Sequence, residues 1–187
     1  MIRLSVGTSG KRKDAAGNAE NAEDAKTRVS ALSAFSIVEG FILEEVFMKY
    51  KKFGEYYVIR FDRGEELVKG LLDFSEKEGV RLGIVSGIGA ADFMDVGLYS
   101  VEEKEYHSVE LRGEMEITAL NGNITEMEGK PYLHLHVSAG NSKMQVQGGH
   151  LRALRISGTG EVFVTVIEGT VGREKDEKGT GLNVFSL

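Results

Sequence analysis

The feature that most constrains the fold is an alternation of apolar and polar residues that runs through most of the chain after Met48. Successive side chains of a strand point to opposite faces of a sheet, so a period of two indicates strands with one buried face. This alternation predicts strands over 56–61, 80–86, 95–100, 109–120, 132–138, 144–147, 160–167 and 182–187. Most of the chain after Met48 is therefore expected to be sheet.

One helix is expected between the first two of these strands. Asp62 is a candidate N-cap, and acidic residues fill the first turn after it. Apolar residues then recur at helical spacing up to Glu78, and Gly79 is expected to end the helix. One early helix followed by many strands indicates an α+β domain with a central, largely antiparallel sheet and one main helix packed on it.

Two short segments are interpreted as turns or loops. Gly87-Ile88-Gly89 follows a predicted strand, but Asp92 stands where a dinucleotide-binding fingerprint requires a small residue, so a tight turn is favoured over phosphate binding. The mixed-sign cluster at 173–178 is expected to be a solvated loop before the last strand.

The first 47 residues differ in composition from the rest. Residues 8–28 are small and charged, which predicts disorder or a weak, solvated helix. Residues 29–47 roughly follow helical spacing and predict an amphipathic helix. We therefore expect one domain over 48–187, preceded by an extension over 1–47 that is disordered or weakly helical. One hypothesis is that Met48 begins the native protein and that this extension is not native.

Charge and cysteine content narrow the function classes. With 23 Lys and Arg against 29 Asp and Glu, the net charge of −6 leaves no generally basic surface for nucleic acid, so any DNA contact would be local. The chain has no cysteine, which leaves His, Asp and Glu as candidate metal ligands. No apolar stretch is long enough to span a bilayer, and no signal-peptide pattern occurs. We expect a cytoplasmic protein with no membrane partner.

Three of the four histidines fall close together in the sequence. His134 and His136 share one face of a predicted strand, about 6.6 Å apart at roughly 3.3 Å per residue. A turn after this strand folds the chain back, and Gly148-Gly149 allows His150 to turn toward the pair. Three histidines with an open fourth position form a zinc site of the catalytic type, and such a site can also bind nickel or cobalt. Packing without a metal is the alternative interpretation. His107 has no partner by spacing and is assigned no role.

The strand predicted over 109–120 adds carboxylates to this hypothesis. Its apolar and polar residues separate by parity, and Glu114 and Glu116 lie on the polar face. If this strand neighbours the histidine strand, these carboxylates point to the same side as His134 and His136. Glu116 is then a candidate catalytic base, a fourth ligand or a partner for an imidazole N–H, and a plain solvated face is the alternative.

Several short motifs follow one another from about Phe53 to the C-terminus. They are Tyr57-Val58-Ile59-Arg60 with Gly64-Glu65-Glu66, Ser86-Gly87-Ile88-Gly89-Ala90, Gly113-Glu114-Met115-Glu116-Ile117, Gly122-Asn123-Ile124, Gly129-Lys130-Pro131-Tyr132-Leu133-His134-Leu135-His136, Gly148-Gly149-His150-Leu151 and Gly160-Glu161. In this order they resemble the plant- and prokaryote-conserved (PPC) domain family. The resemblance implies an α+β subunit with a central antiparallel sheet that assembles into a homotrimer.

The same resemblance bears on partners and on the metal. In plant members the domain accompanies AT-hooks in nuclear proteins and mediates self-association and partner binding, but no Arg-Gly-Arg-Pro hook occurs here. Direct DNA binding is therefore disfavoured. The chain more distantly resembles acetolactate decarboxylase, which holds zinc through a His-x-His pair and a later histidine. His134, His136 and His150 match that pattern in order, which implies a metal site and not the decarboxylation.

The leading hypothesis is a homotrimeric PPC-domain protein that binds a ligand or partner and holds Zn²⁺ or another divalent metal on His134, His136 and His150. One alternative is a zinc-dependent lyase or hydrolase with Glu116 or Glu114 as base. A second alternative is a DNA-associated protein like the plant AT-hook relatives. The sequence does not decide whether the protein is an enzyme, nor does it identify a substrate.

Overall fold

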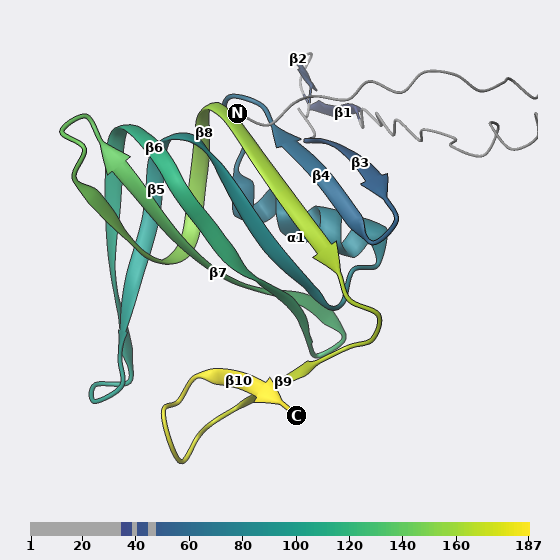
Figure 1. Cartoon of the computed structure of the whole chain (residues 1–187), viewed down its shortest axis with the longest axis vertical. Coiled ribbons are helices and arrows are strands. Elements are labelled where there is room, and N and C mark those ends of the chain that lie inside the picture. Colours follow the sequence, from purple (N-terminus) through teal and green to yellow (C-terminus); the bar gives the residue numbers. More distant parts are fainter. Residues whose placement is uncertain (1–34, 39–40, 45–47) are drawn as a thin grey trace, which may run out of the picture.

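The computed structural model describes residues 35–38, 41–44 and 48–187 (Figure 1). Strands β1 (Phe35–Val38) and β2 (Phe41–Glu44) pair antiparallel. The amphipathic helix predicted over 29–47 is therefore wrong at these positions. Aromatic and β-branched residues on both sides of Glu39-Gly40 favour a hairpin over a helix. The remaining residues of the predicted 1–47 extension lie outside the described part.

A large sheet forms most of residues 48–187, and it is antiparallel, as predicted; it has six strands. Its strands are β3 (Lys49–Phe53), β4 (Tyr56–Phe61), β5 (Gly83–Ser100), β6 (Glu105–Met127), β7 (Lys130–Asn141) and β8 (Val146–Val166). They are ordered β3-β4-β8-β5-β6-β7, and β7 also pairs with β8, so the four strands β5 to β8 close on themselves. A hairpin of β9 (Gly172–Lys175) and β10 (Asn183–Ser186) lies beyond one end of this closed part (Figure 1).

Two long strands, β5 and β8, each join segments that the sequence predicts as separate strands. The segments 80–86 and 95–100 belong largely to one strand, β5, and 144–147 and 160–167 belong largely to β8. The tight turn predicted at Gly87-Ile88-Gly89 is wrong, since β5 continues through it with an irregular register. A β-carbon at Gly87 or Gly89 would lie 2.8 Å or 2.3 Å from a carbonyl oxygen of β8. These glycines therefore permit close strand pairing and do not form a turn.

Helix α1 (Leu67–Glu78) covers one face of the sheet (Figure 1). Its N-cap is Glu66 and not Asp62, because the Glu66 carboxylate accepts hydrogen bonds from the backbone of Val68 and Lys69. The predicted end is confirmed, with Gly79 in the left-handed conformation at φ 68°. Among the described residues, no helix is both long and apolar enough to cross a bilayer.

The two faces of the sheet have different surroundings. On β4, Tyr57, Ile59 and Phe61 are buried, and they form one core cluster with Leu71 and Phe74 of α1. The opposite face exposes apolar side chains on three adjacent strands. We call these residues the outer apolar face: Val58, Ile84, Ile88 and Phe163, exposed by 39%, 52%, 58% and 53%.

Candidate metal centre and pocket

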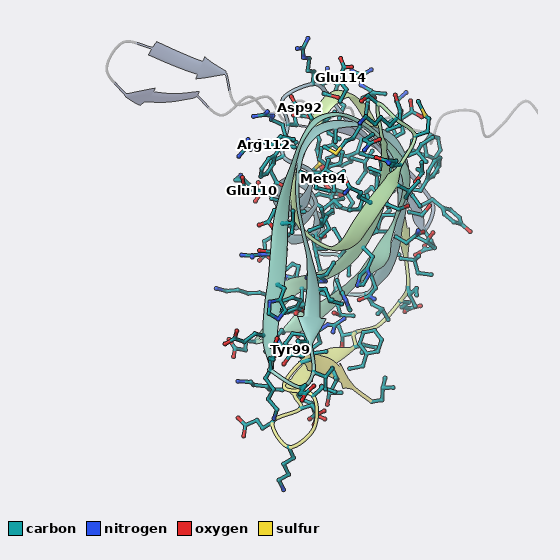
Figure 2. The ribbon with its side chains drawn as sticks, turned by 90° about the vertical axis from the view of Figure 1, so that its left-hand side faces the viewer. Asp92, Met94, Tyr99, Glu110, Arg112 and Glu114 are labelled. Atoms are coloured by element: carbon teal, nitrogen blue, oxygen red, sulfur yellow. The ribbon has the colours of Figure 1, made fainter. Side chains whose placement is uncertain are left out.

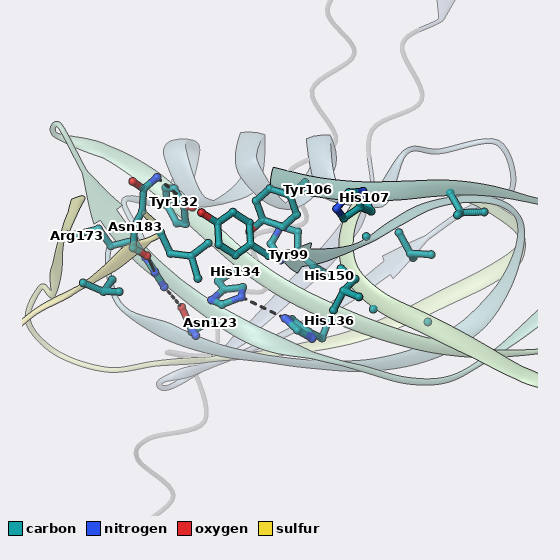
Figure 3. A pocket seen from close by; sticks show the side chains of 18 of the residues that line it. Tyr99, Tyr106, His107, Asn123, Tyr132, His134, His136, His150, Arg173 and Asn183 are labelled. Carbon is teal, nitrogen blue, oxygen red and sulfur yellow. Dashed lines mark hydrogen bonds between the residues drawn. The ribbon is translucent and has the colours of Figure 1, made fainter. Parts of the chain in front are cut away.

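The structure brings the three histidines together (Figure 3). His134 and His136 lie on β7, and His150 of β8 pairs directly with His136. One nitrogen from each ring lies within 4.8 Å of the others, and the Nε2 atoms of His134 and His136 are 3.2 Å apart. Leu135 and Val137 point the other way into the core. The parity predicted for this strand therefore places both imidazoles on one face.

Two glycines before His150 explain how β8 reaches this position. A β-carbon at Gly148 would lie 2.0 Å from the carbonyl oxygen of Val137 on β7. A β-carbon at Gly149 would lie 2.6 Å from the carbonyl oxygen of Gly97 on β5. Only glycine allows the backbone of β8 to fit between its two neighbours here, as the Gly148-Gly149 motif suggests.

The surroundings of the histidines favour neutral imidazoles. Burial, reinforced by the charges of His150, His136 and Arg173, lowers the pKa of His134 to about 4. Burial also lowers the pKa of His150, with further contributions from His136 and Arg152. Neutral imidazoles keep a lone pair for a metal ion. The Nδ1 atom of His150 is buried and has no hydrogen-bond partner among the described residues. An unpartnered, buried imidazole nitrogen beside two other imidazoles fits a divalent metal.

The histidines line a cavity of about 1050 Å³ (Figure 3). Its walls come from β7 and β8, from the connected ends of β5 and β6, from Asn123 farther along β6, and from the β9–β10 hairpin. Tyr99, Tyr106, Tyr132 and Phe185 contribute aromatic rings to these walls. None of the described residues that line the cavity is an aspartate or a glutamate.

Arg173 is a pocket residue that the sequence did not reveal. The solvated loop predicted at 173–178 is wrong at its start, because β9 includes Arg173. The guanidinium donates hydrogen bonds to Thr125 Oγ1 at 2.8 Å, the Asn183 carbonyl oxygen at 2.7 Å and Asn123 Oδ1 at 2.9 Å. It also lies 4.6 Å from the ring centres of both Tyr132 and Phe185. The only available sequence signal was the short hairpin pattern around Gly179-Thr180-Gly181.

The carboxylates predicted beside the histidines lie elsewhere. Strand β6 does neighbour β7, but Glu116 pairs with Gly140, four residues beyond His136 and about 13 Å away along the strand. Neither Glu114 nor Glu116 lines the cavity or belongs to the histidine group. Figure 2 shows Glu114 at the opposite end of the molecule from the pocket residue Tyr99.

A bulge determines which residues of β6 face the histidines instead. Between the pairs Ile117–Ala139 and Ala119–Ser138, β6 contains the extra residue Thr118. The parity of β6 therefore changes, and the amides Asn121 and Asn123 lie opposite His136 and His134. His107 also lines the cavity, but its ring contacts the Glu103 carboxylate and stands apart from the histidine group.

Comparison with known proteins identifies the family. The model of the Plants and Prokaryotes Conserved (PCC) domain matches residues 48–168. The chain belongs to this family. The predicted resemblance is thus confirmed, and the three histidines of this PCC domain lie within the matched segment, whereas Arg173 and the β9–β10 hairpin follow it.

Solved structures share the fold of this PCC domain. A candidate DNA-binding protein from Bacteroides thetaiotaomicron is 32% identical, with a TM-score of 0.73 over 75% of this chain and 98% of its own. A metal-containing protein from Archaeoglobus fulgidus is 31% identical, with a TM-score of 0.67 over 84% of this chain and 100% of its own. A plant- and prokaryote-conserved protein from Pyrococcus horikoshii is 30% identical, with a TM-score of 0.67 over 81% of this chain and 98% of its own. No curated protein matches the chain.

Proposed function

We propose that this PCC domain is a metal-dependent ligand-binding module in which His134, His136 and His150 hold a divalent ion such as Zn²⁺. The observation that carries the proposal is the convergence of three ring nitrogens within 4.8 Å of one another. The metal-containing relative from Archaeoglobus fulgidus supports it. Three imidazoles leave coordination positions open, and a ligand in the cavity can occupy them.

Binding is favoured over a lyase or hydrolase reaction at the same site. A histidine-bound metal can polarise a carbonyl or activate water, but such chemistry usually also needs a base within hydrogen-bond reach. Glu116 and Glu114 lie away from the cavity, and no other carboxylate among the described residues lines it. The geometry therefore supports a module that binds its ligand through the metal.

Association with DNA is the alternative that the Bacteroides thetaiotaomicron relative raises. The net charge of −6 argues against a phosphate-binding surface on this chain. The pocket supports a role as a metal-dependent ligand-binding module.

Metal analysis of the purified, untagged protein tests the proposal. After saturation with Zn²⁺ and dialysis, we expect about one ion per chain, as three imidazoles provide one site. The double variant His134→Ala/His136→Ala should lose this ion. His107→Ala is the matched control, since His107 lines the same cavity outside the histidine group, and it should keep the ion. A wild-type protein that retains no stoichiometric Zn²⁺, Co²⁺ or Ni²⁺ would overturn the proposal.

We also propose that the PCC domain assembles into a homotrimer through the outer apolar face. Val58 and Phe163 are direct cross-strand neighbours, and Ile84 and Ile88 continue the patch on β5. Adjacent apolar side chains of this kind on the surface of a sheet favour contact with another protein surface. The occupant that we propose is a second copy of the chain.

A further inference from the structure

We infer that the histidine pocket binds a small organic carboxylate, with its carboxylate group held by the metal ion and Arg173 and its apolar part against the aromatic wall. This inference rests on the proposed metal site. It concerns the class of ligand, which neither the family nor the relatives specify.

The balance of charge in the cavity is the first argument. A divalent ion bound by three neutral imidazoles keeps its double positive charge. Arg173 adds a positive charge to the same wall and forms no ion pair with a carboxylate of the described residues. Since no acidic residue lines the cavity either, both charges are uncompensated. Half-buried charges without a counter-ion are costly, so the cavity favours an anion.

The hydrogen-bonding groups of the cavity give the second argument. Arg173 uses three of its five N–H groups within the chain, and the part of the chain that the structure describes provides no partner for the other two. Asn123 accepts from Arg173 through Oδ1, so its amide NH₂ remains available as a donor beside His134. Available donors next to a metal site match the oxygens of a carboxylate.

The remaining wall gives the size and character of the ligand. Leu98, Val109, Leu182 and Val184 line the cavity together with the rings of Tyr106 and Phe185. A volume of about 1050 Å³ suits a small molecule and not a single inorganic ion. An anionic group attached to an apolar body fits both parts of the cavity.

Calorimetric titration of the Zn²⁺-loaded protein tests the inference. The probes are acetate, hexanoate, benzoate and phenylacetate, each compared with its uncharged amide of the same shape. We expect benzoate, hexanoate and phenylacetate to bind at least about tenfold more tightly than their amides, because only the acids gain charge-assisted bonds. If no acid binds more tightly than its amide, the inference is overturned.

Substitution of Arg173 tests whether this residue binds the carboxylate group of the ligand. Arg173→Gln should weaken benzoate binding about tenfold and leave benzamide binding unchanged. The matched control is Arg112→Gln, because Arg112 also lies over an aromatic ring, that of Phe93, but is exposed and does not line the cavity. If Arg173→Gln disturbs the hairpin and abolishes the binding of both benzoate and benzamide, the comparison of acids with amides in the wild-type protein still tests the inference.

Metal content distinguishes this inference from the proposed function. A protein that holds Zn²⁺ but does not prefer acids overturns the inference alone. A protein that holds no metal overturns the proposed function, and the carboxylate inference falls with it.

Discussion

Gly122 of β6 lies against the strand that carries the histidines. A β-carbon at this position would lie 2.1 Å from the carbonyl oxygen of His134 and 2.9 Å from the Cα of Leu135. Both contacts are with backbone, so a side chain can be accommodated only if β6 and β7 separate. We predict that Gly122→Ala lowers the free energy of unfolding by about 2 kcal/mol or more, as measured by denaturant titration.

Gly140 of β7 is the matched control for Gly122. It is also a strand glycine, but a β-carbon there would meet nothing within 4 Å. Gly140→Ala should change the free energy of unfolding by less than about 0.5 kcal/mol. Equal destabilisation by the two substitutions would contradict the role assigned to close packing at Gly122.

At the residue scale, the sequence predicts the histidine strand well and its neighbour poorly. Alternation places His134 and His136 on one face, and the glycines before His150 indicate its approach. The carboxylate prediction followed the parity of 109–120 but not the register, because Glu116 lies opposite Gly140, about 13 Å along β7 from His136. The register of a strand pair depends on both strands, so the alternation within one strand does not reveal it.

The C-terminal end of α1 is held to the sheet by a carboxylate. Glu78 accepts hydrogen bonds from the hydroxyls of Tyr50 at 2.6 Å and Tyr57 at 2.9 Å. Burial acts to raise the pKa of Glu78, but these hydrogen bonds and the charges of Lys77 and Lys52 together outweigh it, so the pKa lies below its usual value. A lowered pKa in the folded state stabilises the fold above the unfolded value of about 4.3, and this stabilisation is lost as the pH falls through the folded value.

We predict that Glu78→Gln lowers the free energy of unfolding near neutral pH by about 1 kcal/mol, since the hydrogen bonds to a charged acceptor are partly exposed. The difference from wild type should narrow below about pH 4.3 as Glu78 becomes protonated in the wild-type protein. Denaturant titrations of both proteins between pH 7 and pH 3 measure this difference in the free energy of unfolding. Glu114→Gln is the control, because Glu114 is exposed and has no hydrogen bond or ion pair with the described residues. A difference for Glu78→Gln that stays constant with pH would contradict the prediction.

At the element scale, strand and helix positions were predictable but strand lengths were not. Glycines such as Gly87 and Gly89 resemble turn residues in sequence, while their role is to let β5 pair closely with β8. The same composition serves both purposes, and only the neighbouring strand distinguishes them. Arg173 was missed for a related reason, since its partners Asn123 and Thr125 lie far from it in the sequence.

The outer apolar face leads to a prediction for the whole molecule. Light scattering should give the mass of a trimer for the wild-type protein. Phe163→Glu introduces a charge at the centre of this face, next to Val58, and should shift the mass toward that of a monomer. Met144→Glu is the control, because Met144 is equally apolar and 79% exposed but lies in the turn between β7 and β8. A wild-type protein that is monomeric at working concentration contradicts the proposal.

Charge leads to a second prediction at this scale. With a net charge of −6, the protein should show no salt-dependent shift of duplex DNA in a gel assay. The control is a basic DNA-binding protein run on the same gel, whose shift should weaken as salt increases. Binding by this chain that is strong at low salt and lost at high salt would contradict the prediction and favour a local DNA-binding patch.

The pairing of β8 with β4, β5 and β7 also has a kinetic consequence. Tyr56 of β4 pairs with Thr165 of β8, on the order of a hundred residues later in the chain, so the sheet joins segments that are synthesised far apart in time. Until β8 leaves the ribosome, β4 has its hairpin partner β3 on one side only, and its other edge has no strand to pair with. Folding of this chain should therefore be slow for its size, and the sheet should form completely only after β8 has been synthesised.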